Sequence, residues 1–93
     1  MSDAIITYET IYDLLRKEKY EQELQKLPQT FFQDVVNYLK EKQSIINAQK
    51  SQDSIFSQEY KKTEKQIDNI KKILQELYDR RENKIIQLAL FSS

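Results

Sequence analysis

Apolar residues recur along most of the chain at intervals of three and four, the spacing of one face of an α-helix. The clearest run lies in the second half and consists of Ile67, Ile70, Leu74 and Leu77. Neither proline nor glycine occurs from about Ile55 to Leu90, so we expect one continuous helix there. Such a helix would be about 50 Å long, more than the diameter of a compact domain of this size. Part of its apolar face should therefore need a surface outside the chain's own core.

A first helix is predicted near the N-terminus. It should begin after Thr7, whose hydroxyl suits an N-cap, and end within the polar residues 16–23. Its inward face is expected to consist of Tyr8, Ile11, Tyr12 and Leu15, widened by Leu14.

A second helix is predicted to begin at Pro28 or a residue or two later, because proline is favoured at the first helical position. The polar residues 47–54 should form the loop that follows it. We expect the buried face of this helix to consist of Phe32, Val35, Val36, Leu39 and Ile46, flanked by Phe31 and Tyr38.

Composition supports an all-helical fold. The chain has 93 residues, no glycine and one proline, and glycine supplies the positive φ angles of tight hairpin turns. A chain of this length suits a single domain, residues 1–93. We therefore predict an all-α fold of about three main helices with a long C-terminal helix.

Several kinds of chemistry are excluded by missing residue types. Without histidine or cysteine there can be no Ser–His or Cys–His nucleophile and no thiolate zinc site. Without glycine, the phosphate-binding loops of nucleotide-binding proteins are absent. We expect no enzymatic activity, no catalytic residue, and no metal or cofactor. No apolar run approaches the roughly 20 residues that span a bilayer, so we expect no membrane partner.

The charges bear on nucleic-acid binding. Lysine plus arginine and aspartate plus glutamate each number 15, so the formal net charge is zero, which argues against a generic nucleic-acid binder. Two basic clusters can be solvated helix faces or transient phosphate contacts: Arg16, Lys17 and Lys19, and Lys61, Lys62 and Lys65. Direct nucleic-acid binding is expected to be weak or absent.

Three cations interrupt the last apolar stripe. Arg80 suits the negative end of the helix dipole. Arg81 and Lys84 instead continue the apolar spacing, and an unpaired buried charge is very costly. Arg81 should therefore reach a carboxylate with its planar fork or lie at an edge with its tip in water. The carboxylates considered are Glu9 and Asp13 in the first helix, or an acid on another subunit.

The order of these segments resembles the N-terminal helical domain of archaeal GINS subunits, of the class whose helical A domain precedes a small β-rich B domain. The match runs from about Tyr8 to Leu90 and rests on "LLRKEK", "ELQKLPQTFFQDVVNYL" and the closing "YDRRENKIIQLAL". Its most specific pieces are Leu27-Pro28 with Phe31-Phe32, and Arg80-Arg81 with Lys84-Ile85.

The resemblance implies a non-enzymatic DNA replication factor. GINS is a four-subunit assembly that joins the MCM helicase and a RecJ/Cdc-type partner at the replication fork. The implied direct partners are other GINS subunits, and the implied location is the cytoplasm, at nucleoid-associated forks. No residues remain for a B domain after Leu90, so we expect either an A domain separated from the rest of its subunit, which we favour, or a shortened subunit. Interface or structural roles are implied for Leu27, Pro28, Phe31, Phe32, Ile70, Leu74, Leu77, Arg81, Ile85 and Leu88.

Two other functions remain open. The main alternative is a stand-alone helical or coiled-coil adaptor protein. Its weakness is that the apolar repeat lasts only about two heptads before Arg81, whereas a free coiled coil usually shows three or four. The third is a weak nucleic-acid-binding module built on the lysine clusters.

Overall fold

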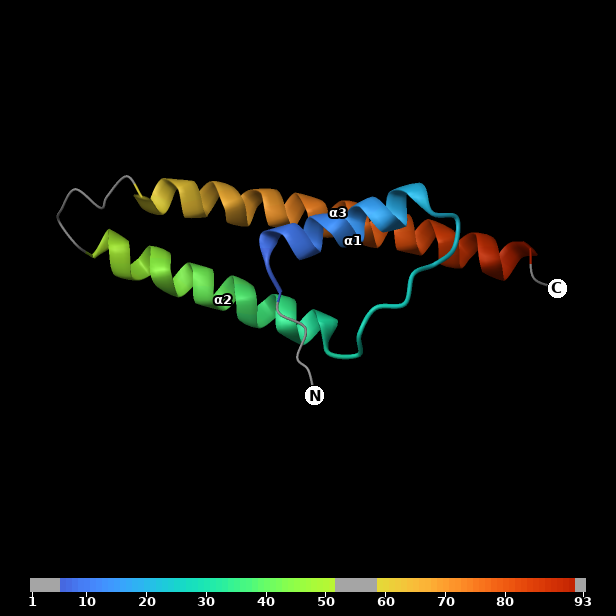
Figure 1. Cartoon of the computed structure of the whole chain (residues 1–93), viewed down its shortest axis with the longest axis horizontal. Coiled ribbons are helices and arrows are strands. Elements are labelled where there is room, and N and C mark those ends of the chain that lie inside the picture. Colours follow the sequence, from blue (N-terminus) through green and yellow to red (C-terminus); the bar gives the residue numbers. More distant parts are fainter. Residues whose placement is uncertain (1–5, 52–58, 92–93) are drawn as a thin grey trace.

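Three α-helices make up the regular structure of the chain. A computed structural model describes residues 6–51 and 59–91, and these contain α1 (Tyr8–Tyr20), α2 (Phe31–Lys50) and α3 (Glu59–Phe91) but no strand (Figure 1). The prediction of a small all-α fold with a long C-terminal helix is therefore confirmed.

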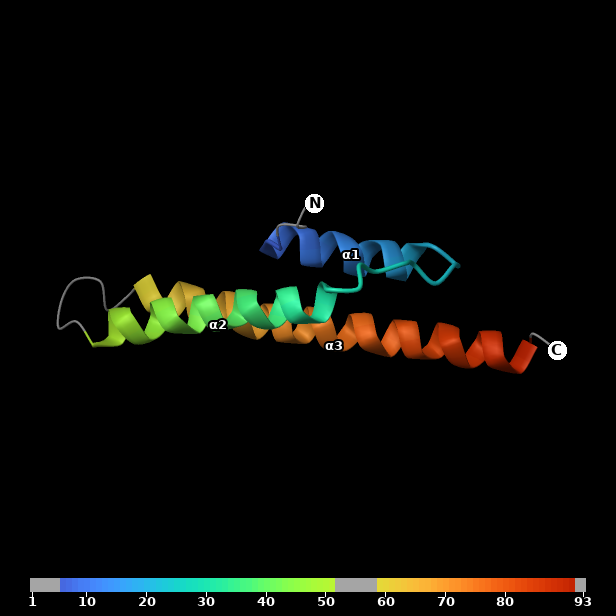
Figure 2. The same cartoon turned by 90° about the horizontal axis from the view of Figure 1, so that it is seen from below.

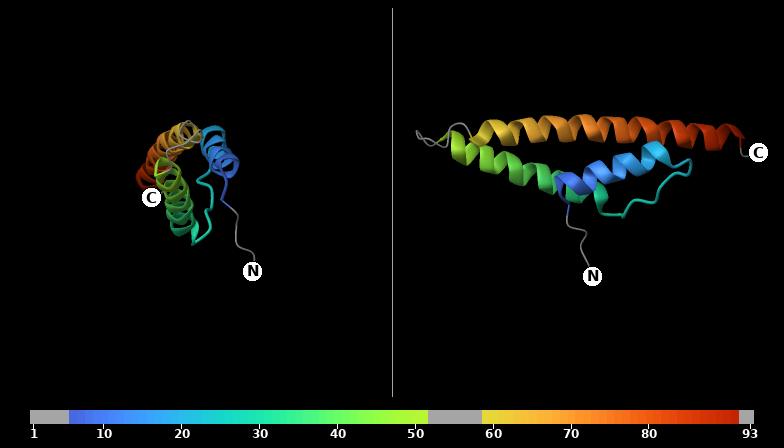
Figure 3. Two further views of the ribbon diagram at one scale, coloured as in Figure 1. Left: turned by 90° about the vertical axis from the view of Figure 1, so that its left-hand side faces the viewer. Right: turned by 45° about the horizontal axis from the view of Figure 1, so that its top comes forward.

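The longest helix, α3, is the element on which the other two pack. α2 runs antiparallel to its first half, and α1 lies alongside its middle (Figures 1 and 2). The arrangement is elongated, with principal extents of 61 × 29 × 16 Å. Its radius of gyration is 16.6 Å, against about 12 Å for a compact domain of this length. The C-terminal end of α3 projects past both shorter helices (right panel of Figure 3).

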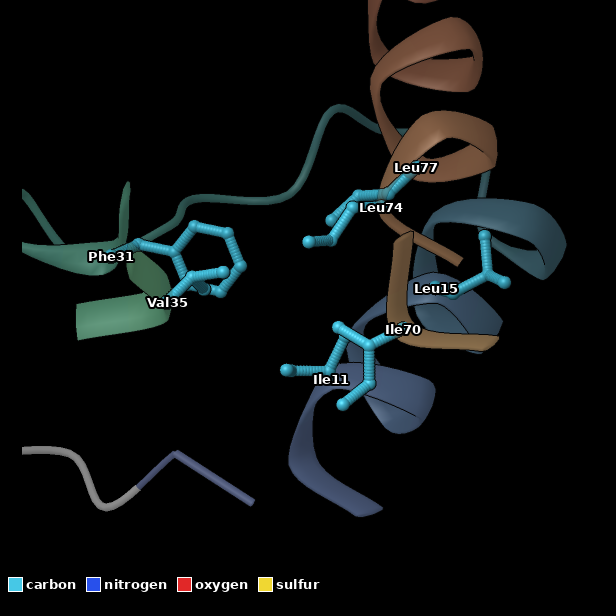
Figure 4. Packing of buried hydrophobic residues seen from close by; sticks show 7 residues of the cluster. All are labelled: Ile11, Leu15, Phe31, Val35, Ile70, Leu74 and Leu77. Carbon is cyan, nitrogen blue, oxygen red and sulfur yellow. The ribbon is translucent and has the colours of Figure 1, made fainter. Parts of the chain in front are cut away.

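The hydrophobic core lies where all three helices meet. Figure 4 shows side chains from α1, α2 and α3 pointing into one shared space. The buried members of this cluster are Ile11, Leu15, Phe31, Val35, Ile70, Leu74 and Leu77. Ile46 and Ile67 are also buried. The predicted stripe of Ile67, Ile70, Leu74 and Leu77 is thus confirmed in full.

The start of α1 follows the prediction. The Thr7 side chain accepts a hydrogen bond from the backbone N–H of Thr10 at 3.2 Å, and the Thr10 hydroxyl accepts one from the Thr7 N–H at 2.7 Å. Two backbone donors that lack helical partners are satisfied by this reciprocal cap. Of the expected inward face, Ile11 and Leu15 are buried, but Tyr12 is exposed.

The face that α2 buries matches the prediction only in part, since Val35 and Ile46 are buried as expected. Phe31 is 1% exposed and belongs to the core, whereas Phe32 is 50% exposed and Val36 is also exposed. The helix begins at Phe31 rather than within two residues of Pro28. Neighbouring helical residues point about 100° apart, so choosing Phe32 over Phe31 rotates the expected face away from the core.

The expected loop after α2 is shorter than predicted at its beginning. Residues 47–50 continue α2, and the N–H of Ser51 donates to the carbonyl of Asn47 at 3.2 Å. The rest of the predicted loop and the predicted start of the last helix near Ile55 fall on residues 52–58, outside the described residues.

Candidate functional site

A buried carboxylate lies where the end of α1 meets α3. Glu18 is 1% exposed and is the buried charged residue in the described part of the chain. Arg81 donates to Glu18 Oε1 at 2.9 Å, and Lys84 donates to Glu18 Oε2 at 2.8 Å. Both cations come from successive turns of α3 and are themselves mostly covered, with side-chain exposures of 19% and 14%.

Gln25 completes this arrangement from the segment that connects α1 to α2. Its side-chain amide donates to Glu18 Oε1 at 2.9 Å, and its backbone N–H donates to Oε2 at 3.2 Å. Each carboxylate oxygen therefore accepts two hydrogen bonds, which fills the usual capacity of the group. We call Glu18, Gln25, Arg81 and Lys84 the Glu18 cluster.

The same cations also hold the backbone of the connecting segment. Arg81 donates to the carbonyl of Gln25 at 2.7 Å. Lys84 donates to the carbonyls of Glu21 and Glu23 at 2.8 and 2.9 Å. The connection between α1 and α2 contains no regular structure at these positions, so its polar backbone groups find partners on α3 instead.

The electrostatics of Glu18 follow from these contacts. Burial alone would raise the pKa of its carboxyl, but hydrogen bonds from Lys84, Gln25 and Arg81 outweigh burial and lower the pKa from 4.5 to about 2. The group is thus ionised at neutral pH and has no oxygen lone pair left for a reacting proton. Glu18 acts as a structural anion that fixes the end of α1 and the connecting segment onto α3.

Arg81 forms an ion pair with a carboxylate, but its partner differs from those expected. The prediction that Arg81 pairs with Glu9 or Asp13 is wrong. Asp13 pairs with Arg16 at 3.7 Å on the surface, and Arg81 pairs with Glu18. Glu18 lay within a segment that looked uniformly polar. A signal was nevertheless available, because Glu18 continues the spacing of the two buried residues Ile11 and Leu15. No comparable pattern marks Gln25.

The residues expected near the start of the second helix take different positions. Leu27 is partly buried against the core, and Phe31 is part of it. Pro28 is exposed and lines a surface groove beside α1. Phe32 stacks on Tyr78 of α3, with ring centroids 5.5 Å apart.

The last two turns of α3 present a different kind of surface, which we call the apolar end of α3 (residues 85–91). Ile85 and Leu88, both expected at an interface, are exposed within this chain. Ile86, Leu90 and Phe91 are exposed as well, and Phe91 reaches 82%. These five residues lie on several sides of the helix because successive residues are rotated by about 100°. A helix end that is apolar all round is usually surrounded by other protein.

The described residues contain neither a group of acidic side chains suited to a metal ion nor a helix suited to span a membrane. Residues 6–51 and 59–91 contain no group of three or more aspartate or glutamate side chains placed to hold a metal ion. Over the same ranges, no helix combines the length and apolar character needed to cross a bilayer.

Comparison with known proteins gives no assignment: no protein-family model, curated protein or solved structure matches the chain.

Proposed function

We propose that this chain is a non-enzymatic assembly module, the helical A domain of a GINS-like replication subunit, which associates with other GINS subunits through the apolar end of α3. Within the full complex it would support the MCM helicase and its RecJ/Cdc-type partner. The resemblance in segment order supports the GINS part of the proposal. The exposure of the apolar end supports the assembly part.

The observation that carries the proposal is the large apolar surface left uncovered at one end of a long helix. The chain exposes 7385 Å², about 1,700 Å² more than the roughly 5,700 Å² expected for a compact monomer of its mass. A typical protein interface covers about 800 Å² on each partner. This excess belongs to the elongated chain as a whole, and the apolar end of α3 is the place where five large apolar side chains are exposed close together.

The Glu18 cluster supports the same proposal by holding α3 in place. Arg81 and Lys84 are the last residues of α3 that bind the rest of the described chain through their side chains in ion pairs, and the apolar end begins directly after them. The cluster thus fixes the position from which the apolar end projects. An interface gains affinity when the surface that it uses is already ordered in the free protein.

The proposal is tested by mixing the purified chain with a complementary archaeal GINS subunit and measuring the molar mass by size-exclusion chromatography with light scattering. We expect a stable complex. The double variant Ile86→Glu/Leu90→Glu should weaken it at least about tenfold, because each change removes an apolar contact and places a charge in the interface.

The matched control is Gln66→Glu, which adds a negative charge to an exposed position near the other end of α3. It should leave complex formation unchanged. A chain that stays monomeric at high concentration and binds no complementary subunit would overturn the proposal. If Gln66→Glu weakened binding as much as Ile86→Glu/Leu90→Glu, the charge of α3 and not its apolar end would determine assembly.

A further inference from the structure

The zero net charge of the sequence conceals an uneven distribution along the molecule. The basic hairpin, as we call residues 40–50 of α2 and 59–72 of α3, contains eight lysines and four carboxylates, a net charge of +4. The remaining described residues carry seven cations and nine carboxylates, a net charge of −2. The helices of the basic hairpin lie together at the end of the molecule farthest from the apolar end of α3 (Figure 1).

The two parts also differ in how their cations are used. Outside the basic hairpin, five of the seven cations pair with carboxylates of the described chain: Arg16, Lys19, Arg80, Arg81 and Lys84. Within the basic hairpin, one of the eight lysines does so, Lys50 with Glu64 at 3.2 Å. Among the described residues, most of the positive charge of the hairpin is therefore not neutralised by direct contact.

Three of these lysines form a row on a rigid support. Lys61, Lys65 and Lys72 are exposed and follow helical spacings of four and seven, so they lie on one side of α3, which also carries the exposed Asp68. The row extends over about 16 Å of helix. The opposite side of α3 is fixed by burial of Ile67 and Ile70, so the row does not depend on a flexible loop for its shape.

We propose that the basic hairpin contacts the phosphate backbone of duplex DNA without reading its sequence. Duplex DNA carries one negative charge per about 1.7 Å of axis, so a length equal to the lysine row presents about ten charges. Lysine is a point-charge phosphate ligand that imposes little geometry, which suits contact independent of sequence. This inference rests on the charges of the hairpin and is independent of the proposed assembly role.

The structure favours duplex DNA over two other polyanions. Single strands are usually held by stacking of bases on exposed aromatic rings. Here the tyrosine rings are occupied by lysines and are not free to stack on bases. Lys50 lies over the Tyr60 ring at 5.2 Å and Lys42 over the Tyr38 ring at 5.5 Å. A membrane surface requires a free apolar helix face. In the described hairpin that face is buried, and Ile45 is the exposed large apolar side chain there.

The test is the anisotropy of a dye-labelled duplex of mixed sequence, titrated with the full chain at several salt concentrations between about 50 and 200 mM. We expect weak binding whose affinity falls steeply with salt, with a log–log slope of about −3 for three phosphate contacts. The variant Lys65→Gln/Lys72→Gln should make that slope shallower by about two.

The matched control is Lys17→Gln/Lys26→Gln, which removes the same charge from two exposed lysines outside the hairpin that form no ion pair within residues 6–51 and 59–91. It should leave the slope within about half a unit of wild type, and circular dichroism should show both variants folded. No binding at about 50 mM salt would overturn the proposal. So would an equal change of slope in the control, or binding to phosphatidylserine vesicles as strong as to DNA through the same two lysines.

Discussion

The change Glu18→Gln should destabilise the chain more than any other single loss of a negative charge. Glutamine has nearly the same shape as a protonated glutamate and can still accept hydrogen bonds through one oxygen. What it removes is the negative charge between Arg81 and Lys84. The two cations would then share a covered site without a counter-charge, a costly arrangement.

The magnitude follows from the pKa of Glu18. A pKa lowered from 4.5 to about 2 means that the ionised form is favoured by the fold. At 1.36 kcal/mol per pKa unit, that preference is worth about 3 kcal/mol. Removing one partner of a buried ion pair by mutation costs about 3–5 kcal/mol, which agrees with that value. For a domain of this size the melting temperature should fall by roughly 15 °C.

The assay is urea unfolding at pH 7, followed by circular dichroism, with wild type and variant compared at equal protein concentration. Glu82→Gln is the matched control, because it removes the same charge from an exposed position on α3 and should change stability by less than about 0.5 kcal/mol. If Glu18→Gln lost no more stability than Glu82→Gln, the Glu18 cluster would not hold α1 and its connecting segment on α3 as described.

Three further results are expected for the isolated chain. Because folding lowers the pKa of Glu18, its stabilisation is complete well above pH 4.5 and should be lost as the pH falls toward 2, so unfolding titrations should show a steeper acid dependence for wild type than for Glu18→Gln. Ile70→Ala should lower the free energy of unfolding by about 3 kcal/mol, whereas Ile86→Ala should change it by less than about 0.5 kcal/mol; equal losses in urea unfolding would contradict the assigned core. Thr7→Ala should cost about 1 kcal/mol of stability through the lost helix cap, and Thr7→Ser should keep most of that stability. If Thr7→Ala and Thr7→Ser melted at the same temperature, the Thr7 side chain would not be stabilising α1 as a cap.

The parts of the fold that could be predicted depend on periodicity within one helix. The spacing of Ile67, Ile70, Leu74 and Leu77 requires no knowledge of the other helices, because any partner must cover that one stripe. The cap at Thr7 is likewise a local matter of side chain and backbone. Both were confirmed.

The parts that could not be predicted depend on rotation and on contacts between distant segments. Phe31 and Phe32 are chemically the same and adjacent, so which one faces the core depends on the rotation of α2 about its own axis. The partner of Arg81 depended on how far α1 extends along α3, which placed Glu18 rather than Glu9 or Asp13 beside it. Even so, the interrupted stripes of α1 and α3 could have been matched, since a buried acid on one and buried bases on the other require each other.

The connecting segment between α1 and α2 has a consequence for how this sequence can vary. Surface loops normally accept inserted or deleted residues. Here the carbonyls of Glu21, Glu23 and Gln25 must meet Lys84 and Arg81. Removing or adding one residue between them would shift at least one of these carbonyls away from the cation that it meets. The side chains of this segment are therefore freer to change than its length, and a natural variant with a longer connection should also have lost the lysine or the arginine.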